Sequence, residues 1–218
     1  CGLAIENTMI YHTPEVKERL EQFGVPVLVD YSSYETEPLG RTEWVKLYGL
    51  LTGRQEEAEA AWAAQQEAFS QASAPSTGKT VAFFYITASG EVNVRKPSDY
   101  LAKMIGIAGG TYLFDDLGDK DDTASSTMSL QMEEFYAAAK DADYMIYNST
   151  IEGELSSVEE LLQKSPLLAK CKAVEEGNVY CTTKNIYQSS MALGTILTDL
   201  HHIIAEDGGD LTYLYRLD

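Results

Sequence analysis

Polar and aromatic side chains that could recognise a ligand lie at the ends of segments that read as strands. Glu6 and Tyr34 each follow an apolar run, while Arg41, Arg95 and Tyr187 lie at loop mouths further along the chain. In open α/β sheets, ligands gather at the carboxyl ends of strands. Arginine binds anions through charge-assisted hydrogen bonds, and tyrosine combines apolar surface with a hydroxyl. We therefore predict that these five residues bind a bulky ligand that is partly anionic and partly aromatic.

The common catalytic and cofactor motifs are absent from the sequence, which contains no dinucleotide fingerprint, P-loop, nucleophile elbow or zinc-protease motif. His12 precedes a predicted helix cap. His201 and His202 are adjacent, so on a helix they point about 100° apart and do not favour a shared metal. The acidic loop at residues 115–122 lacks the ligand order of a calcium-binding loop. The sequence thus predicts no catalytic residue, no metal and no cofactor.

Composition restricts the classes of partner. The chain has 218 residues, with 16 Lys and Arg against 34 Asp and Glu, which gives a formal net charge of −18. Such a charge argues against binding to nucleic-acid phosphates and disfavours anionic membrane surfaces. The length fits one large α/β unit or one complete lobe plus part of another. No apolar run is long enough to span a membrane and no signal segment is recognisable, so we expect a soluble chain.

Three cysteines occur, and none belongs to a CxxC pair. Cys171 and Cys181 are expected to be buried thiols, with a disulfide between them as the alternative. Cys1 could be the acylated cysteine of a processed lipoprotein. That interpretation is the less favoured one, because residues 2–5 resemble a strand and not a flexible polar tether.

The first thirty residues read as a strand, a helix and a strand. After the apolar start, Thr13 and Pro14 open a helix, Gly24 ends it, and the apolar run 27–29 is typical of a strand in a parallel sheet. One βαβ unit cannot form a domain alone. Its sheet must be completed by upstream residues, by the rest of the chain or by a partner.

The longest predicted helix covers residues 41–72. Apolar residues at three- and four-residue spacings form one stripe along it. Glycines weaken the helix locally, so we expect a kink or break near Thr52 and Gly53. A linker rich in Ser, Pro and Gly follows at residues 70–78.

A second α/β lobe is predicted after the linker. Helices are expected to start at the cap residues Ser98 and Ser129, and the alternation of strands and helices indicates βαβ units. The expected strands cover residues 81–86, 92–94, 144–147 and 178–181, and the later helices cover residues 157–163 and 191–204.

Several stretches, taken in order, resemble the substrate-binding proteins of ABC importers for iron-siderophores, haem and cobalamin. They are residues 27–44, the helix that ends in Ala-Gly-Gly at Gly110, residues 129–148 and residues 173–180. The resemblance implies an α/β fold of class III periplasmic-binding-protein type, similar to chelatases, in which one long helix joins two lobes.

The resemblance also implies that most of the N-terminal lobe is missing from this chain. Residues 1–40 would be the remnant of that lobe, residues 41–74 the connecting helix, and residues 75–218 the C-terminal lobe. Family members present one glutamate per lobe to arginines of the permease. The second-lobe glutamate matches Glu133 or Glu134.

The implied function is capture without chemistry, so the chain is not expected to be an enzyme. A ferric siderophore, haem or cobalamin would lie between the lobes against the five residues named above. The stiff helix would limit closure to a small hinge motion. The protein would deliver its ligand to an ABC permease, at the extracellular face of the cytoplasmic membrane or in the periplasm.

Two other classes of function stay open. A chelatase-like enzyme would need a cluster of histidines or carboxylates at the cleft, whereas the histidines of this sequence are isolated or adjacent. A shortened relative could act as an interaction module, because an exposed βαβ edge favours pairing with a second copy as a homodimer.

Overall fold

Residues 1–35 form the first of two units in the computed structural model, which describes residues 1–117 and 126–218. Strands β1 (Ala4–Asn7) and β2 (Val27–Asp30) pair in parallel, as the predicted βαβ unit requires. The connection contains the 3-10 helix η1 (Thr8–His12) and helix α1 (Pro14–Gln22). Ile10 is the one buried residue of this unit, which therefore has almost no core of its own.

The second unit, residues 36–218, begins with three helices where the sequence predicted one over residues 41–72. They are α2 (Pro38–Glu43), α3 (Val45–Thr52) and α4 (Gln55–Ala72). The chain breaks at the predicted place, because Gly53 adopts a left-handed φ of 70° and ends α3.

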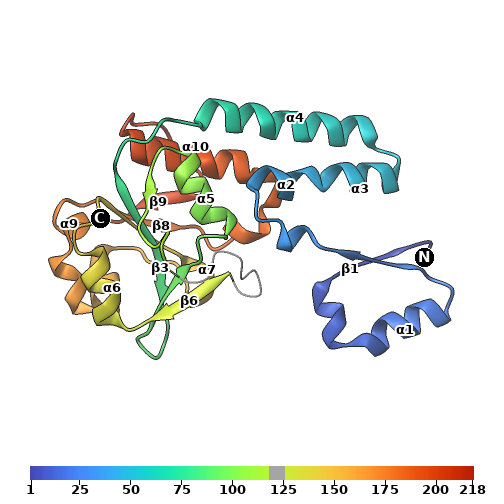
Figure 1. Ribbon diagram of the computed structural model, residues 1–218, viewed down its shortest axis with the longest axis horizontal. Coiled ribbons are helices and arrows are strands. Elements are labelled where there is room, and N and C mark those ends of the chain that lie inside the picture. The colour runs from blue at the N-terminus through green and yellow to red at the C-terminus, as the bar shows by residue number, and fades with distance from the viewer. Residues whose placement is uncertain (118–125) are drawn as a thin grey trace. The chain divides into compact units, whose positions relative to one another are not determined.

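Helices α3 and α4 then pack against each other, as Figure 1 shows. A Cβ atom on Gly49 would lie 2.4 Å from Cβ of Ala58, so this packing needs glycine. The apolar stripe predicted for one continuous helix is therefore divided between two packed helices.

A seven-stranded mixed sheet forms the centre of the second unit. Its order is β6-β4-β3-β7-β8-β9, and β5 also pairs with β3. Strands β3, β5, β7 and β8 are parallel, and β4, β6 and β9 run antiparallel to their neighbours. The strands are β3 (Thr80–Ile86), β4 (Val92–Arg95), β5 (Thr111–Tyr112), β6 (Thr127–Leu130), β7 (Tyr144–Tyr147), β8 (Val179–Thr182) and β9 (Leu214–Arg216).

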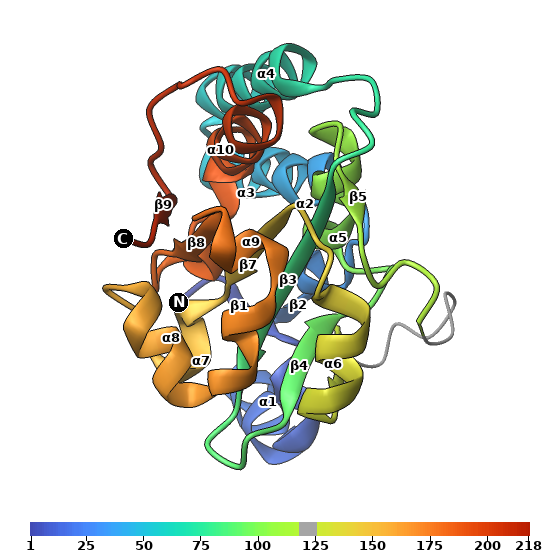
Figure 2. The ribbon, with the colours of Figure 1, turned by 90° about the vertical axis from the view of Figure 1, so that its left-hand side faces the viewer.

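Helices cover both faces of this sheet. Helices α4, α5 (Tyr100–Ile107) and α10 (Leu193–Ala205) group on one side, and α6 (Met132–Ala139) and α9 (Lys172–Glu175) lie on the other (Figures 1 and 2). The shorter elements are η2 (Ser32–Tyr34), α7 (Ser149–Glu152), α8 (Val158–Lys164), η3 (Pro166–Lys170), η4 (Ile186–Gln188) and η5 (Ser190–Ala192).

Two helix starts differ from the sequence prediction. Residues 127–130 form strand β6, in which Ser129 pairs with Asn93, so Gln131 and not Ser129 precedes α6. The N-cap of α5 is Asp99 and not Ser98, because the Asp99 carboxylate accepts from the backbone N–H of Leu101 at 2.9 Å. Pairing with β4 outweighs the capping preference of Ser129.

The thiols of Cys171 and Cys181 are free and buried, as predicted. Burial raises the pKa of Cys171 to about 11, so this thiol is not a reactive thiolate at neutral pH. The acidic loop lies largely outside the described residues. Within them, no helix combines the length and the apolar character that a membrane span needs.

Asp143 joins the start of β7 to β3 and α9. Its Oδ2 accepts from the backbone N–H and the hydroxyl of Thr80 at 2.8 and 3.0 Å, and its Oδ1 lies 2.6 Å from Nζ of Lys172. Burial alone would raise the pKa of Asp143. The Lys172 ammonium and the Thr80 donors outweigh burial and lower the pKa to about 2.

We expect the Asp143 carboxylate to make the free energy of unfolding fall at acid pH. A lowered pKa means that its contribution is complete above the ordinary value of 3.8 and is lost as the pH falls toward about 2. Since Lys172 is 41% exposed, we expect a contribution of only about 1 kcal/mol. Urea unfolding of Asp143→Asn at neutral pH and at acid pH measures it. A stability of Asp143→Asn at neutral pH that equals that of the unmodified protein would contradict the assignment.

Candidate functional site

Three of the predicted ligand-binding residues lie in one polar cluster of the second unit. The guanidinium carbon of Arg95 lies 4.5 Å from the ring centroid of Tyr187, and that of Arg41 lies 4.1 Å from the ring centroid of Tyr100. Asp99 links these two cation–ring pairs. Its carboxylate lies 3.6 Å from Arg95, and the positive charge of Arg41 also acts on it. We call Arg41, Arg95, Asp99, Tyr100, Asn148 and Tyr187 the arginine–tyrosine cluster.

The fold builds this cluster from four separate segments. Arg95 ends β4, Asn148 directly follows β7, and Tyr187 lies in η4, shortly after β8. Since β7 and β8 are parallel, their carboxyl ends meet at one edge of the sheet. Asn148 and Tyr187 therefore lie at this edge, and Arg95 contacts Tyr187 from the antiparallel strand β4.

Asn148 determines which way the Tyr187 hydroxyl points. The Asn148 Oδ1 atom accepts from the backbone N–H of Thr150 at 3.3 Å, so its Nδ2 atom must be the donor to the Tyr187 hydroxyl at 3.1 Å. The hydroxyl is thus an acceptor in that bond and keeps its own proton. A half-buried phenol O–H remains for an acceptor atom on a ligand.

Several contacts with neighbouring residues hold Arg95 in place. Its side chain is 10% exposed, its Nη1 atom donates to the hydroxyl of Ser126 at 3.0 Å, and its carbonyl accepts from Tyr112 at 2.6 Å. Because its guanidinium is nearly buried, Arg95 supports the Tyr187 ring and supplies positive charge. It offers less direct contact to a ligand than the sequence prediction assumed.

The charges of the cluster are partly compensated. Burial raises the pKa of Asp99, while Arg95 and Arg41 oppose that rise. Burial and the Asp99 charge also raise the pKa of Tyr100 to about 12. Arg41 and Arg95 bring two guanidinium groups close to Asp99, in a chain whose net charge is −18. Guanidinium groups at a binding site favour an anionic ligand.

The first unit carries a separate group of tyrosines at the carboxyl ends of its two strands. The hydroxyls of Tyr11 and Tyr31 lie 2.5 Å apart, and the rings of Tyr31 and Tyr34 are 6.0 Å apart. All three side chains are exposed. We call Tyr11, Tyr31 and Tyr34 the tyrosine cluster; its exposed rings form a surface on which a flat aromatic ligand can stack.

The hydrogen bond between Tyr11 and Tyr31 gives a prediction that can be tested by absorbance. That bond, more than burial, raises the pKa of Tyr31 above its ordinary value of 10.0. We expect Tyr11→Phe to bring the pKa of Tyr31 down toward that value in an ultraviolet titration. Tyr34→Phe is the matched control and should leave it unchanged. If the pKa of Tyr31 were the same in Tyr11→Phe as in the unmodified protein, the two hydroxyls would not be hydrogen-bonded.

The other predicted site residues are placed as follows. Glu6 is half-buried within β1, opposite Val29, and not beyond the strand end. Tyr34 belongs to the tyrosine cluster. Glu133 and Glu134 are exposed in the first turn of α6, where the helix dipole favours carboxylates. Their predicted contact with a permease stays a prediction.

Three residues of the two clusters, Tyr11, Asp99 and Asn148, are not among the predicted site residues. Tyr11 follows β1 just as Tyr31 follows β2, so the parallel pairing of the strands would have placed them together. The predicted helix start at Ser98 puts Asp99 inside the helix and gives no sign of its role as cap and charge partner. Asn148 directly follows the predicted strand 144–147, but nothing in its spacing indicates Tyr187 as its partner.

The histidines are not part of either cluster. His201 and His202 both face Asp207, at 3.9 and 2.7 Å. Among the described residues, no three His, Cys, Asp or Glu side chains gather as a metal site of those ligands would require.

Comparison with known families matches most of the chain. A sequence model of the family described as "Periplasmic binding protein" matches residues 6–186. An uncharacterized lipoprotein of Methanocaldococcus jannaschii is 27% identical over 195 residues, which cover 87% of this chain and 43% of the relative. The chain therefore spans less than half the length of that curated relative.

Solved structures share the fold at low sequence identity. The periplasmic heme-binding protein RhuT of Roseiflexus has a TM-score of 0.71 at 20% identity, covering 94% of this chain and 76% of that protein. A periplasmic heme-binding protein of Pseudomonas aeruginosa has a TM-score of 0.68 at 19% identity, covering 100% and 77%. A structure titled as an ABC-type Fe³⁺-hydroxamate transport system, from Saccharomonospora viridis, has a TM-score of 0.67 at 18% identity, covering 86% and 64%.

Proposed function

Because this chain belongs to the periplasmic binding protein family, we propose that it captures an iron complex for an ABC importer. The ligand is a ferric siderophore or haem, with cobalamin as the alternative. The observation that carries this proposal is the arginine–tyrosine cluster, in which the Tyr187 hydroxyl proton has no acceptor among the described residues and the Tyr187 ring lies against the Arg95 guanidinium. The named neighbours that bind haem or belong to Fe³⁺-hydroxamate transport support the ligand class.

The chemistry of the two clusters suits such a ligand. Haem propionates and siderophore oxygens are anionic hydrogen-bond acceptors, which match the Tyr187 hydroxyl and the charge of Arg41 and Arg95. A porphyrin or a catechol has a flat π-system that can stack on the exposed rings of the tyrosine cluster. Glu6 and Tyr34 are the proposed contacts of the first unit, and Arg41, Arg95 and Tyr187 those of the second.

No chemical step is proposed, since the described clusters serve binding. After capture, the exposed carboxylates of Glu133 and Glu134 on α6 are the proposed contacts to basic residues of the permease. The family and the lipoprotein relative support a place at the extracellular face of the cytoplasmic membrane or in the periplasm.

The test is a titration of the chain with haemin, a ferric hydroxamate and cobalamin, followed by intrinsic fluorescence and melting temperature. We expect saturable quenching and a melting temperature that rises with the concentration of one ligand class. Tyr187→Phe should weaken binding about tenfold, because it removes one hydrogen bond to a charged acceptor. Tyr136→Phe, which changes a half-buried tyrosine outside the cluster, should bind like the unmodified protein. If none of the three ligands quenches or stabilises the chain, the proposal fails.

A homodimeric interaction module is the second candidate, favoured by the nearly coreless first unit. Ile5, Met9, Val16 and Phe23 of that unit are exposed apolar side chains, with Phe23 72% exposed. A two-stranded parallel sheet with so little burial is stabilised by pairing with further strands. Sedimentation distinguishes the candidates: a dimer that bound no iron complex would favour the module, and a monomer would exclude it.

A further inference from the structure

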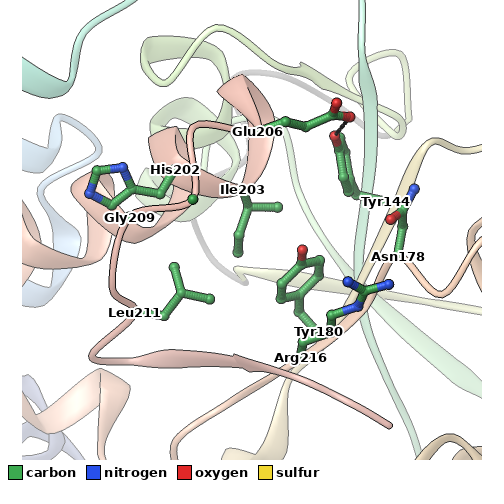
Figure 3. A pocket seen from close by; sticks show the side chains of 10 residues that line it. Tyr144, Asn178, Tyr180, His202, Ile203, Glu206, Gly209, Leu211 and Arg216 are labelled. Atoms are coloured by element: carbon green, nitrogen blue, oxygen red, sulfur yellow. Dashed lines mark hydrogen bonds between the residues drawn. The ribbon is translucent and has the colours of Figure 1, made fainter.

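A cavity lies at the edge of the sheet where β7 and β8 begin. Its volume is about 360 Å³, near the lower end of the range for small-molecule sites. Figure 3 shows Tyr144, Tyr180, Ile203 and Leu211 around it, with Glu206 and Arg216 on different sides. It thus combines apolar walls with two opposite charges.

Arg216 offers an unused fork of donors to this cavity. Its Nε atom donates to the carbonyl of Gly177 at 2.6 Å, which fixes the side chain. Its two terminal nitrogens have no hydrogen-bond partner among the residues that the structure describes, and the same holds for the hydroxyl of Tyr180. A guanidinium held in this way is suited to a carboxylate, which it can bind through two parallel hydrogen bonds.

Glu206 offers the opposite charge. It ends α10 with a φ of 56°, a left-handed conformation that residues with a side chain rarely adopt. Its Oε1 atom accepts from the Tyr144 hydroxyl and lies 3.3 Å from Nζ of Lys79, while Oε2 has no partner within the described chain. The carbonyls at the C-terminus of α10 add negative potential. Together they favour an ammonium group.

Local contacts hold the turn that follows Glu206. Asp207 pairs with Nδ1 of His202 at 2.7 Å and accepts from the backbone N–H of Gly209 at 3.1 Å. A Cβ atom on Gly209 would lie 2.4 Å from the His202 ring, so the ring packs directly on the glycine. These contacts restrict the backbone of the turn, which lowers the cost of ordering it around a ligand.

We propose that this cavity binds a free α-amino acid with an apolar side chain. The carboxylate binds Arg216 and the Tyr180 hydroxyl, the ammonium faces Glu206 and the end of α10, and the side chain packs on Ile203 and Leu211. A ligand that carries only one of the two charges makes only one of these two contacts, either to the terminal nitrogens of Arg216 or to Oε2 of Glu206.

Isothermal titration of the intact chain with L-leucine tests this proposal, with isocaproate and isoamylamine as the analogues that lack the ammonium or the carboxylate. We expect L-leucine to bind and each analogue to bind at least about tenfold more weakly, because one charge-assisted contact is lost. No heat with L-leucine, or equal binding of isocaproate or isoamylamine, would overturn the proposal.

Two charge-removing variants locate the site. Arg216→Gln and Glu206→Gln should each weaken L-leucine binding about tenfold, whereas Arg54→Gln and Glu56→Gln, on an exposed part of the second unit, should not change it. Glu206→Gln keeps an acceptor for Tyr144 and Lys79, so it tests the site even where Arg216→Gln loosens β9. Unchanged binding in Glu206→Gln would place the ligand elsewhere and overturn the assignment.

Discussion

Arg95→Ala should lower the free energy of unfolding by about 3 kcal/mol, because it leaves the buried carboxylate of Asp99 without its nearest cation. The side chains of Arg95 and Asp99 are 10% and 5% exposed and lie 3.6 Å apart. Arg41 still acts on Asp99 after the change, so the expected loss is at the lower end of the range for a broken buried pair. Urea unfolding of the two proteins at neutral pH measures the difference.

A double-mutant cycle separates the charge from the packing. Asp99→Asn keeps the helix cap, because asparagine also accepts from the N–H of Leu101, but removes the charge. In Arg95→Ala/Asp99→Asn we expect recovery of about 1 to 2 kcal/mol relative to Arg95→Ala alone. A double variant less stable than Arg95→Ala would show that the loss comes from the packing of Arg95 on Tyr187 and not from the stranded carboxylate.

The same variant bears on ligand binding. Arg95 supports one face of the Tyr187 ring while Asn148 holds its hydroxyl. Removing Arg95 therefore frees the ring as well as reducing the positive charge. Arg95→Lys keeps the charge but loses the planar stacking on Tyr187. We therefore expect this variant to keep most of the free energy of unfolding while its affinity for the ligand falls.

Much of the fold could be predicted from the sequence where local pattern and tertiary structure agree. The apolar runs at residues 81–86 and 144–147 form central strands that are buried except for the half-buried Tyr85, and Thr13 with Pro14 marks the start of α1. Prediction failed where pairing with a distant strand decided the outcome. Ser129 has the chemistry of a cap, yet β4 is available to pair with it.

The helical hairpin shows a second limit. The glycines near residue 50 were recognised as weak points, but one stripe of apolar residues is compatible with a long helix and with two shorter ones that fold back on each other. The close approach of Gly49 to Ala58 decides between them, and it depends on contacts across the turn. Sequence spacing alone does not contain that information.

For the candidate site, residue type is enough to select several residues of the cluster, but it does not predict which side chains contact each other. Arg41, Arg95 and Tyr187 were selected because charged and aromatic side chains near strand ends suit recognition, and they lie in one cluster. Asp99, whose carboxylate pairs with Arg95, does not stand out in the sequence because the predicted helix boundary puts it inside the helix. Whether the first unit's Glu6 and Tyr34 act on the same ligand stays a prediction.

The helix that carries the proposed permease contacts depends on one aromatic anchor. Phe135 of α6 is fully buried, with its ring centroid 4.6 Å from that of Phe84 and 5.6 Å from that of Phe114. We expect Phe135→Ala to lower the free energy of unfolding by about 4 kcal/mol, because it removes apolar burial, leaves a cavity and deletes two ring contacts. Urea unfolding measures the loss.

Matched variants on the same helix test whether the anchor also positions its exposed face. Phe135→Leu fills much of the space and should lose much less stability than Phe135→Ala, whereas Glu133→Gln and Glu134→Gln should change stability by less than about 0.5 kcal/mol. In Phe135→Ala, hydrogen exchange should accelerate in α6 more than in α10, since the anchor is local. Equal acceleration in both helices would mean that Phe135 stabilises the whole unit without fixing α6. The two glutamates would then owe their orientation to other contacts of the helix.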